Sequence, residues 1–149
     1  MNIEQCTPEA RPQWVSMRRR LWPELNEEAN TRDAARVYAD PDRFGIFVAM
    51  DDAHKLIGWA EVSVRSDYVN GCETSPVGFL EGIFVIPQAR RRGVARALCR
   101  RAEEWARERD CQEFASDTLV ENVESHAMHG ALGFEEMERV VYFKKLLSR

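Results

Sequence analysis

Three consecutive arginines, Arg90 to Arg92, stand directly before Gly93 and a stretch with the spacing of an amphipathic helix, in the sequence QARRRGVARAL. A helix that follows a buried strand presents free backbone N–H groups and the positive end of its dipole, so an anion binds well there. Gly93 lets the backbone approach a bulky phosphate, Ala95 leaves the first turn uncrowded, and the arginines add charge-assisted hydrogen bonds. The segment is therefore a candidate phosphate cradle.

The motif R-x-x-G-x-A is short, so other interpretations stay open: a solvated basic start of a helix, a nuclear-localisation signal or a nucleic-acid contact. It is not a P-loop, and it lacks the glycines of a dinucleotide fingerprint. Residues 90–109 contain eight arginines and three glutamates, a net charge of +5, so the remainder of this chain of net charge −4 carries −9. Because nucleic-acid-binding domains usually have a basic face, this distribution opposes a nucleic-acid partner. The acidic remainder suggests a positively charged partner, and the alternative is a solubilising surface.

Two carboxylates are candidates for the same site. Glu81 interrupts the apolar run VGFLEGIFVI, where an unpaired carboxylate is costly, so it must have a partner or face a cleft. Asp117 lies at the carboxyl end of the run EFASD, the end of a strand at which α/β sheets bind ligands. The alternative for each is a solvated surface charge.

The elements that must position these residues alternate along the chain. Apolar runs between turn signals predict strands over residues 45–50, 56–65, 77–86, 113–117 and 138–147. Helical spacing predicts one helix with Thr7 as N-cap and Pro8 at its first position, ending before Pro23. Further helices are predicted at about residues 31–39, after Pro87, and at about 122–132, where Gly133 ends the last. No repeat or linker appears, so we expect one α/β domain over residues 1–149.

The composition is that of an ordinary globular protein, with 44% hydrophobic and 31% charged residues. We find no secretory signal peptide and no apolar stretch long enough to span a bilayer. The four cysteines, Cys6, Cys72, Cys99 and Cys111, show no C-x-x-C spacing. We therefore expect reduced thiols in a cytoplasmic protein with no membrane partner, and Cys99 and Cys111 as core residues rather than nucleophiles.

The segment LEGIFVIPQARRRGVARALCRRAEEWA resembles the coenzyme-A-binding segment of the GCN5-related N-acetyltransferases: a strand, a proline, [QR]-x-x-G-x-[GA] and a helix. ENVESHAMHGALGFEE is similar to the next segment of that family. The stretches LWPELNEEA, YVNGCETSPVGFLEGIFV and FASDTLVENVESHAMHGALGFEEMERVVYF narrow the resemblance to the aminoglycoside 6′-N-acetyltransferases of the bacterial chromosomal type, over nearly the whole chain. The resemblance implies a mixed central sheet flanked by helices, with splayed central strands.

That resemblance also implies an activity and its residues. It implies transfer of an acetyl group from acetyl-coenzyme A to the 6′-amine of an aminoglycoside, conferring antibiotic resistance, by a homodimer that needs no metal. The residues implied for acetyl-coenzyme A, which pair strand backbone with the phosphate loop and an asparagine for the pantetheine arm, are Ile83, Phe84, Val85, Arg90, Arg91, Arg92, Gly93, Val94, Ala95, Arg96 and Asn122. Those implied for the aminoglycoside are Trp22, Tyr68, Glu73, Glu81, Asp117 and Glu138, the last reaching the other subunit's site.

The chemistry follows from the implied substrates. The 6′-amine is largely protonated near neutral pH and must lose a proton before it attacks the thioester directly. Asp117 is the first choice of base, with Glu81 as co-holder or relay, and a backbone N–H near Val85 would hold the oxyanion. The general acid stays open between His129, which could equally be a packed histidine, Tyr142, and none. His126 and His129 at i, i+3 are too few ligands for a metal site.

Two other classes of function remain open from the sequence. The same co-substrate could serve acetylation of a polyamine or a peptide amine, although an acidic, aromatic cleft suits a polycationic sugar better than a neutral peptide. The chain could also be a regulatory module that binds coenzyme A without catalysis. An assay of thiol release with kanamycin, spermidine or a peptide separates these alternatives.

Overall fold

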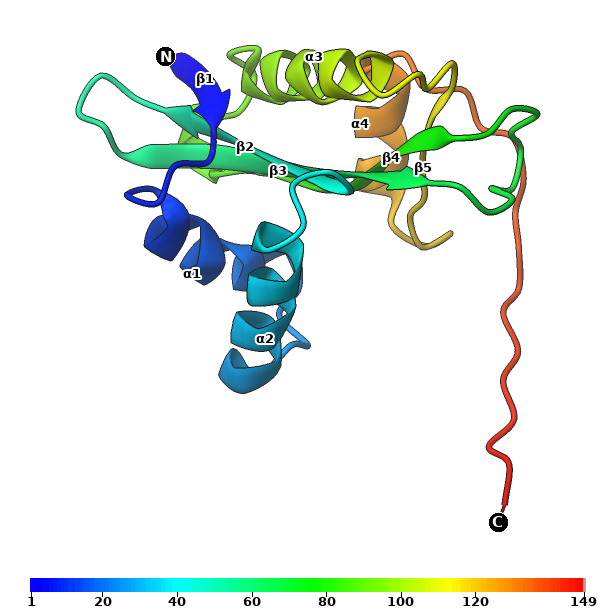
Figure 1. Cartoon of the computed structure of the whole chain (residues 1–149). Helices are drawn as coiled ribbons and strands as arrows, with labels where there is room; N and C mark the ends of the chain where they lie inside the picture. The colour runs from blue at the N-terminus through cyan, green and yellow to red at the C-terminus, as the bar shows by residue number, and fades with distance from the viewer. Residues whose placement is uncertain (149) are drawn as a thin grey trace.

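Five strands form one mixed sheet in the computed structural model, which describes residues 1–148 (Figure 1). The strands lie in the sheet in the order in which they occur along the chain. Neighbours from β1 to β4 pair antiparallel, and β5 joins β4 in parallel. Their bounds are β1 Asn2–Gln5, β2 Phe44–Met50, β3 Leu56–Arg65, β4 Val77–Val85 and β5 Phe114–Ser116.

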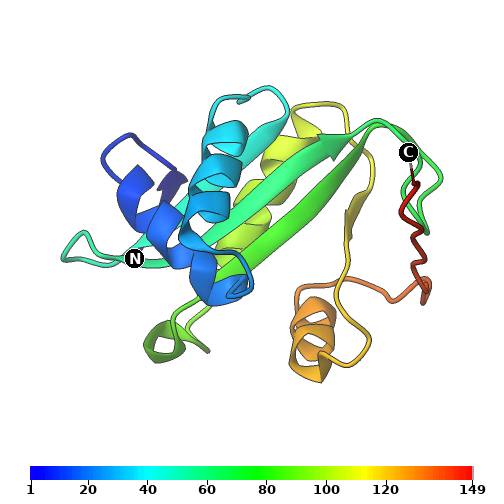
Figure 2. The same cartoon turned by 90° about the horizontal axis from the view of Figure 1, so that it is seen from below.

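Helices cover both faces of this sheet. Helices α1 (Arg11–Leu21) and α2 (Glu27–Tyr38) lie on one face, and α3 (Val94–Arg107) and α4 (Val123–Ala131) lie on the other (Figure 1). Seen along the perpendicular direction, α4 stands beside the sheet at the β5 side rather than over its centre (Figure 2). A 3-10 turn, η1 (Pro87–Ala89), connects β4 to the loop before α3.

Alternation along the strands divides the core into two layers. Leu98, Ala102 and Trp105 of α3 pack on one face of the sheet, against a cluster that includes Val62 and Ile83. Trp14 of α1 packs on the opposite face together with Trp59 of β3. The helix predicted after Pro87 is confirmed, and its buried residues, which include Leu98, Ala102 and Trp105, recur with the spacing of one helix face.

Strand β4 contains a bulge at Glu81. Glu61 of β3 pairs with Gly82 and the next residue, Val62, pairs with Leu80, so Glu81 has no partner of its own. Leu80 belongs to the cluster under α3, whereas a Cβ on Gly82 would touch Trp22 of the α1 side at 2.7 Å. Alternation therefore restarts at the bulge, and a bulge re-aims a side chain in this way. Glu81 faces α1 and α2.

The parallel pair of β4 and β5 is short. Leu80 and Ser116 form its last matched position, and β4 then continues through Val85 without a partner on that edge among residues 1–148. The expected splay between central strands is therefore confirmed. Glu81 of β4 and Asp117, directly after β5, are the first residues beyond the last matched position.

Several predicted boundaries differ from the structure. The first helix begins at Arg11 rather than Pro8, because the Thr7 hydroxyl accepts the Ala10 N–H at 3.2 Å and closes a turn before the helix. Helix α2 begins at Glu27 rather than near residue 31, because the Asn26 side chain caps it by accepting the Ala29 N–H at 2.7 Å. Strand β1 was not predicted. The other helices and strands up to Gly133 lie within a few residues of their predicted positions.

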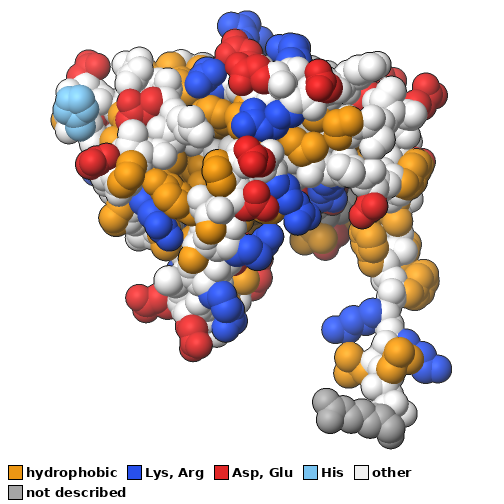
Figure 3. Space-filling model, viewed as in Figure 1, with side chains coloured by type: hydrophobic (Ala, Val, Ile, Leu, Met, Phe, Trp, Pro, Cys, Tyr) orange, Lys and Arg blue, Asp and Glu red, His pale blue; other side chains and the backbone are white. Residues whose placement is uncertain are grey.

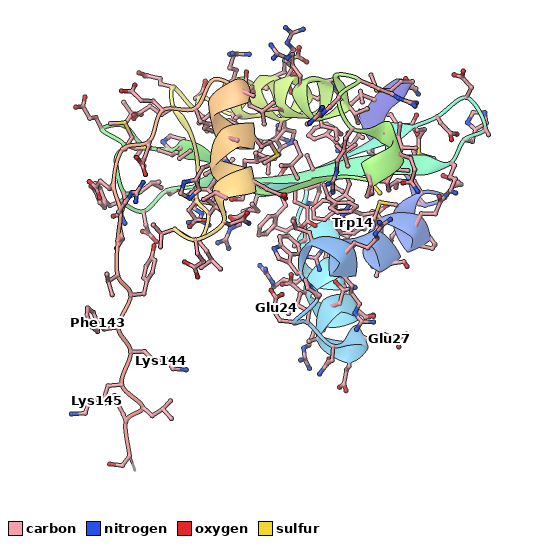
Figure 4. The ribbon with its side chains drawn as sticks, turned by 180° about the vertical axis from the view of Figure 1, so that it is seen from behind. Trp14, Glu24, Glu27, Phe143, Lys144 and Lys145 are labelled. Carbon is pink, nitrogen blue, oxygen red and sulfur yellow. The ribbon has the colours of Figure 1, made fainter. Side chains whose placement is uncertain are left out.

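The predicted strand over residues 138–147 is wrong for the single chain. This segment forms no helix or strand and extends away from the body, carrying Phe143, Lys144 and Lys145 outward (Figure 4). A strand needs a neighbour for its backbone N–H and C=O groups, and the segment pairs with none among residues 1–148. It exposes several large apolar side chains, namely Val140, Val141, Tyr142, Phe143, Leu146 and Leu147.

Candidate active site

The loop before α3 has the backbone shape of an anion site. Arg91 and Gly93 both have positive φ, 64° and 80°, on either side of Arg92. Alternation of this kind turns successive N–H groups toward a common concavity. Gly93 is the N-cap of α3, and no side chain of residues 1–148 donates or accepts a capping hydrogen bond there. The first turn of the helix holds no acidic residue. The positive end of α3 is therefore free to meet an anion.

Open space lies beside this loop. A Cβ built on Gly93 would meet nothing within 4 Å. The side chains of Arg90, Arg91 and Arg92 are exposed around it. Arg90 donates its Nε–H to the Val85 carbonyl at 2.9 Å, which places its guanidinium between the cradle and the end of β4. These features fit a ligand that carries phosphate groups.

The other residues predicted to bind the co-substrate fall into two groups: some lie on the unpaired edge of β4, and others make structural contacts. Ile83 and Val85 are buried and Phe84 is half-buried, in the part of β4 that β5 leaves unpaired. Asn122 is the N-cap of α4, and its side-chain oxygen accepts the Ser125 N–H at 3.2 Å. Arg96 points to α4, where it donates to the Ala131 carbonyl at 3.3 Å. Asn122 and Arg96 thus have structural roles that sequence reasoning did not predict.

Gly93→Val should weaken binding of acetyl-coenzyme A at least about tenfold, because a branched side chain would fill the open space and strain a positive φ. Asp110→Val is the matched control, since Asp110 also has positive φ, 64°, but lies beyond the opposite end of α3. It should lower stability to a similar degree and leave the affinity unchanged. Calorimetric titration of both folded variants with acetyl-coenzyme A measures the affinities. If Gly93→Val bound acetyl-coenzyme A as tightly as the unmodified chain, the phosphate cradle would be contradicted.

A cavity of about 1070 Å³ opens between the sheet and helices α1 and α2. Its walls include Trp22, Tyr68 and Glu81, three of the residues predicted for the acceptor substrate. Acidic side chains outnumber basic ones on its lining, with the acids being Glu24, Asp33, Asp42, Glu61, Asp67 and Glu81 and the bases Arg18, Arg36, Arg43 and Arg65. In surface view, acidic and basic side chains lie close together below α3, among apolar side chains (Figure 3).

The floor of this cavity is a buried ion pair. Arg18, only 1% exposed, donates to Glu61 through Nε at 2.7 Å and through Nη2 at 3.1 Å. The same guanidinium reaches Asn30 Oδ1 at 2.9 Å and Asp33 Oδ2 at 2.6 Å, which ties α1 to both α2 and β3. The Trp14 indole adds an N–H to Glu61 at 3.2 Å. Burial raises the pKa of the Glu61 carboxyl, and the hydrogen bonds from Arg18 oppose that effect.

Beyond this floor, Glu81 is held by β3. Arg65 forms a bidentate ion pair with it, and the Ser63 hydroxyl donates to Glu81 Oε1 at 2.8 Å. The prediction that a carboxylate inside this strand needs a partner or a cleft is confirmed on both counts. Among residues 1–148, Glu24, Asp42 and Asp67 on the cavity wall take part in no ion pair and leave free negative charge there.

The other predicted acceptor residues do not line the cavity. Asp117 is exposed directly after β5, beside the splay. Glu73 lies exposed on the loop over residues 66–76. Glu138 is exposed at the start of the extended segment, next to Met137, whose Cβ lies 2.7 Å from where a Cβ on Gly71 would stand. The extended segment therefore leaves the body past the loop that carries Tyr68 and Glu73.

Glu113 anchors that loop. Its Oε1 accepts the hydroxyl of Thr74, the N–H of Thr74 at 2.7 Å and the N–H of Glu73 at 2.9 Å. The Thr74 hydroxyl, followed by these two backbone N–H groups, lowers the pKa of the Glu113 carboxyl below its ordinary value of 4.5. The anchor therefore has its full strength above pH 4.5 and loses it as the pH falls through the lowered pKa.

Hydrogen exchange should detect this anchor. In Glu113→Gln the amides of Glu73 and Thr74 should lose protection at neutral pH, and the difference from the unmodified chain should shrink below pH 4.5. The amides of Ala53 and Lys55, which donate to Asp51 in another loop, provide the control and should not change. Equal protection of Glu73 and Thr74 in both proteins at neutral pH would contradict the anchor.

The two candidate general acids, His129 and Tyr142, lie in different surroundings. Both ring nitrogens of His129 are occupied, Nδ1 by the Ser125 carbonyl at 2.7 Å and Nε2 by the Ser116 hydroxyl at 2.8 Å. Its ring packs edge-on against Phe134 at 5.2 Å, which favours a packed histidine. Tyr142 is 80% exposed on the extended segment. His126 meets the Leu119 carbonyl, and no three metal-binding side chains cluster within the described chain.

The matched family model covers residues 13–134 and is described as the acetyltransferase (GNAT) family. The chain belongs to the GNAT family. Its mixed sheet with splayed β4 and β5 is the GNAT fold, and the expected fold class is confirmed. Within residues 1–148 no helix is both long and apolar enough to cross a bilayer.

Other GNAT proteins are similar over nearly the full length. The chain is 46% identical to "Aminoglycoside N(6′)-acetyltransferase type 1" of Acinetobacter haemolyticus, over 99% of this chain and 100% of the relative. It is 44% identical to the protein of that name in Salmonella enteritidis, over 97% and 99%.

Two solved GNAT structures are closely similar as well. The apo crystal structure of the aminoglycoside 6′-N-acetyltransferase AAC(6′)-IG from Acinetobacter haemolyticus superposes with a TM-score of 0.94 at 45% identity, over 99% of this chain and 100% of that one. AAC(6′)-Iy in complex with the bisubstrate analogue CoA-S-monomethyl-acetylneamine gives 0.92 at 43% identity, over 98% of each chain.

Sequence reasoning missed the basic half of this GNAT cavity. The signal that identified Glu81, a carboxylate within an apolar strand, applies equally to Glu61 in LIGWAEVSVR. Its partner Arg18 lies in a run of three arginines that look alike in the sequence, and Arg65 stands at a strand end where solvated arginines are common. Only the packing of α1 and β4 against β3 distinguishes them.

Proposed function

We propose that the protein transfers an acetyl group from acetyl-coenzyme A to the 6′-amine of an aminoglycoside, and that this reaction confers antibiotic resistance. The observation that carries the proposal is a cavity with an acidic surplus whose wall includes Glu81, the first residue of β4 beyond its last pair with β5. The relatives named aminoglycoside N(6′)-acetyltransferase, similar over nearly the full length of this chain, support it. So does the similar structure whose bound analogue joins coenzyme A to an aminoglycoside.

In this proposal the loop at Arg90 to Ala95 binds the phosphates of acetyl-coenzyme A, and the exposed arginines neutralise them. The pantetheine arm follows the unpaired edge of β4 toward Glu81, along the backbone of Ile83 to Val85. A backbone N–H near Val85 then stabilises the negative charge that develops on the acetyl oxygen. The acetyl group therefore arrives at the mouth of the acidic cavity.

The acceptor amine must be deprotonated at that point. We assign Asp117 as the base that takes its proton, directly or through water, and Glu81 as the group that orients the ammonium. Trp22 and Tyr68 provide apolar faces for the sugar rings. Glu73 and the unpaired acids on the cavity wall hold the other ammonium groups. Ammonium binding by carboxylates weakens as salt screens the charges, so the Michaelis constant should rise with ionic strength.

The deciding experiment compares acceptors in one assay of thiol release from acetyl-coenzyme A. Kanamycin with a 6′-amine should be acetylated, and an analogue with a 6′-hydroxyl should react poorly. Spermidine and a peptide amine should be weaker acceptors. Mass spectrometry locates the acetyl group: acetate on another ring would refute the 6′ assignment, and thiol release with spermidine alone would favour a polyamine acetyltransferase. Coenzyme A binding with no acceptor at all would favour the regulatory alternative.

We further propose that residues 1–149 act as one N-acetyltransferase domain within a homodimer, whose extended segments pair across the two subunits. The outer edge of β5 carries no strand among residues 1–148, and the exposed apolar side chains of residues 140–147 need a surface to cover them. Such pairing would carry Glu138 toward the partner's cavity. Sedimentation at micromolar concentration should report twice the 17.2 kDa of one chain, and a monomer would contradict the proposal.

The proposed setting is the cytoplasm, without membrane or nucleic-acid partners. The four cysteines are all free thiols, which suits a reducing compartment. Burial raises the pKa of the Cys99 thiol to about 12, which supports its assignment as a core residue rather than a nucleophile.

A further inference from the structure

Arg65 poses a problem for a cavity that binds a polycation. Its guanidinium carries a positive charge at the wall where an ammonium group has to approach, and its side chain is about 40% exposed. Such a charge repels the substrate and weakens its binding. Arg65 therefore needs a compensating role at this position.

The contacts of Arg65 supply one. Its Nη2 donates to both oxygens of Glu81, to Oε1 at 2.8 Å and to Oε2 at 2.9 Å, and its Nε donates to Oε1 at 3.2 Å. The guanidinium carbon lies 3.4 Å from the ring centre of Phe79, and this stacking fixes the plane of the guanidinium. The Nε–H and Nη2–H donors that face Glu81 form a planar fork. The Ser63 hydroxyl closes the arrangement by donating to Oε1 at 2.8 Å.

This arrangement makes the two oxygens of Glu81 unequal. Oε1 accepts three hydrogen bonds, whereas Oε2 accepts one among the described residues. A carboxylate has about four acceptor positions, two on each oxygen, so only Oε2 retains one for a further donor. Because Glu81 sits in the bulge, its backbone alone does not fix the carboxylate, and β3 has to do so.

We propose that Arg65 is a positioning residue that sets the specificity of acceptor binding: it saturates Glu81 Oε1 and leaves Oε2 as the single oxygen that meets the acceptor ammonium. Arg65 thereby weakens substrate binding and improves the alignment of the amine for attack. The inference rests on the proposed function only in requiring a cationic amine as acceptor. It predicts that loss of Arg65 lowers turnover without weakening acceptor binding.

Arg65→Gln should lower kcat for kanamycin about tenfold or more, since a small misplacement of reacting groups costs that much. Its KM should stay the same or fall up to about fivefold, because a repelling charge has gone. Arg65→Lys restores the charge but neither the fork nor the stacking on Phe79, so its KM should return while its kcat stays low. Thermal denaturation establishes that each variant is folded.

Arg43→Gln is the matched control. Arg43 lines the same cavity, stacks on Phe44 and has no contact with Glu81, so the variant removes one positive charge from the cavity and leaves the fork intact. It should lower KM and leave kcat unchanged. An increase in KM at unchanged kcat for Arg65→Gln would overturn the inference, and so would full turnover in Arg65→Lys.

The acceptors that the wild-type chain acetylates separate a failure of this inference from a failure of the proposed function. If the wild type acetylates spermidine but not kanamycin, the proposed function fails. The same split between kcat and KM is then measured with spermidine. If the wild type acetylates kanamycin and Arg65→Gln matches it in both constants, the inference alone fails.

Discussion

Replacing Arg18 by methionine should lower the free energy of unfolding by about 3–5 kcal/mol, since one partner of a buried ion pair is lost while the other stays buried. Glu61, only 2% exposed, would keep just the Trp14 indole N–H at 3.2 Å as a donor among the described residues. For a domain of this size the midpoint of thermal unfolding should fall by roughly 6–20 °C. Urea and thermal denaturation followed by circular dichroism measure the change.

Two controls show whether the buried charge is the cause. The double variant Arg18→Met/Glu61→Leu removes both partners and should recover most of the lost stability. Arg107→Met removes the arginine of an exposed pair with Glu103 and should cost less than about 1 kcal/mol. A double variant no more stable than Arg18→Met would assign the loss to packing instead.

A lower pH should restore part of the stability that Arg18→Met loses. Burial raises the pKa of Glu61 in the folded chain above its ordinary value of 4.5, so the folded state takes up a proton before the unfolded state does. The cost of the buried charge is therefore largest at neutral pH and disappears as Glu61 becomes protonated. The gap in stability between Arg18→Met and the unmodified chain should narrow as the pH falls toward 4.5. A gap independent of pH would show that charge burial is not responsible.

Asp117→Asn should lower turnover with kanamycin by about a hundredfold or more, the usual contribution of a general base. Asparagine keeps the size of the side chain and some of its hydrogen bonding but cannot take a proton. Affinity for acetyl-coenzyme A should stay unchanged, because Asp117 lies beyond β5 and not on the loop before α3. Steady-state kinetics together with calorimetric titration separate the two effects.

Asp67→Asn is the control for charge. Asp67 lines the cavity without an ion partner in the described part of the chain, so its loss should raise KM and leave kcat nearly unchanged. Should Asp117→Asn behave in the same way, Asp117 would be a binding residue and not the base. Turnover equal to that of the unmodified chain would remove Asp117 from the mechanism.

Local patterns predicted most of the sheet and three of the four helices in nearly their observed positions. Strand β3 matches its predicted range, because residues 56–65 alternate between two buried faces and end at turn residues. Gly133 ends α4 with φ of 94°, as a C-terminal glycine should. These features depend on neighbours within a few residues, and therefore the sequence displays them.

Features that depend on distant partners were predicted poorly. Strand β1 exists because residues 2–5 pair with β2, more than forty positions away. The segment over 138–147 has the alternation of a strand but no strand beside it within the described part of the chain. The same limit applies to the site: Glu81 stood out, whereas Arg18 and Arg65 acquire their roles only through contacts with Glu61 and Glu81.

The bulge in β4 separates the chemistry of this protein from its architecture. On either side of Glu81 the nine-residue strand alternates regularly, with Phe79 and Gly82 toward α1 and α2 and Leu80 and Ile83 toward α3. A deletion of Glu81 alone would join the two halves into an ordinary strand in which every apolar side chain keeps its face. The carboxylate is thus carried by the one inserted residue that the sheet does not need. A single codon could add or remove it during evolution while the same framework served a different acceptor.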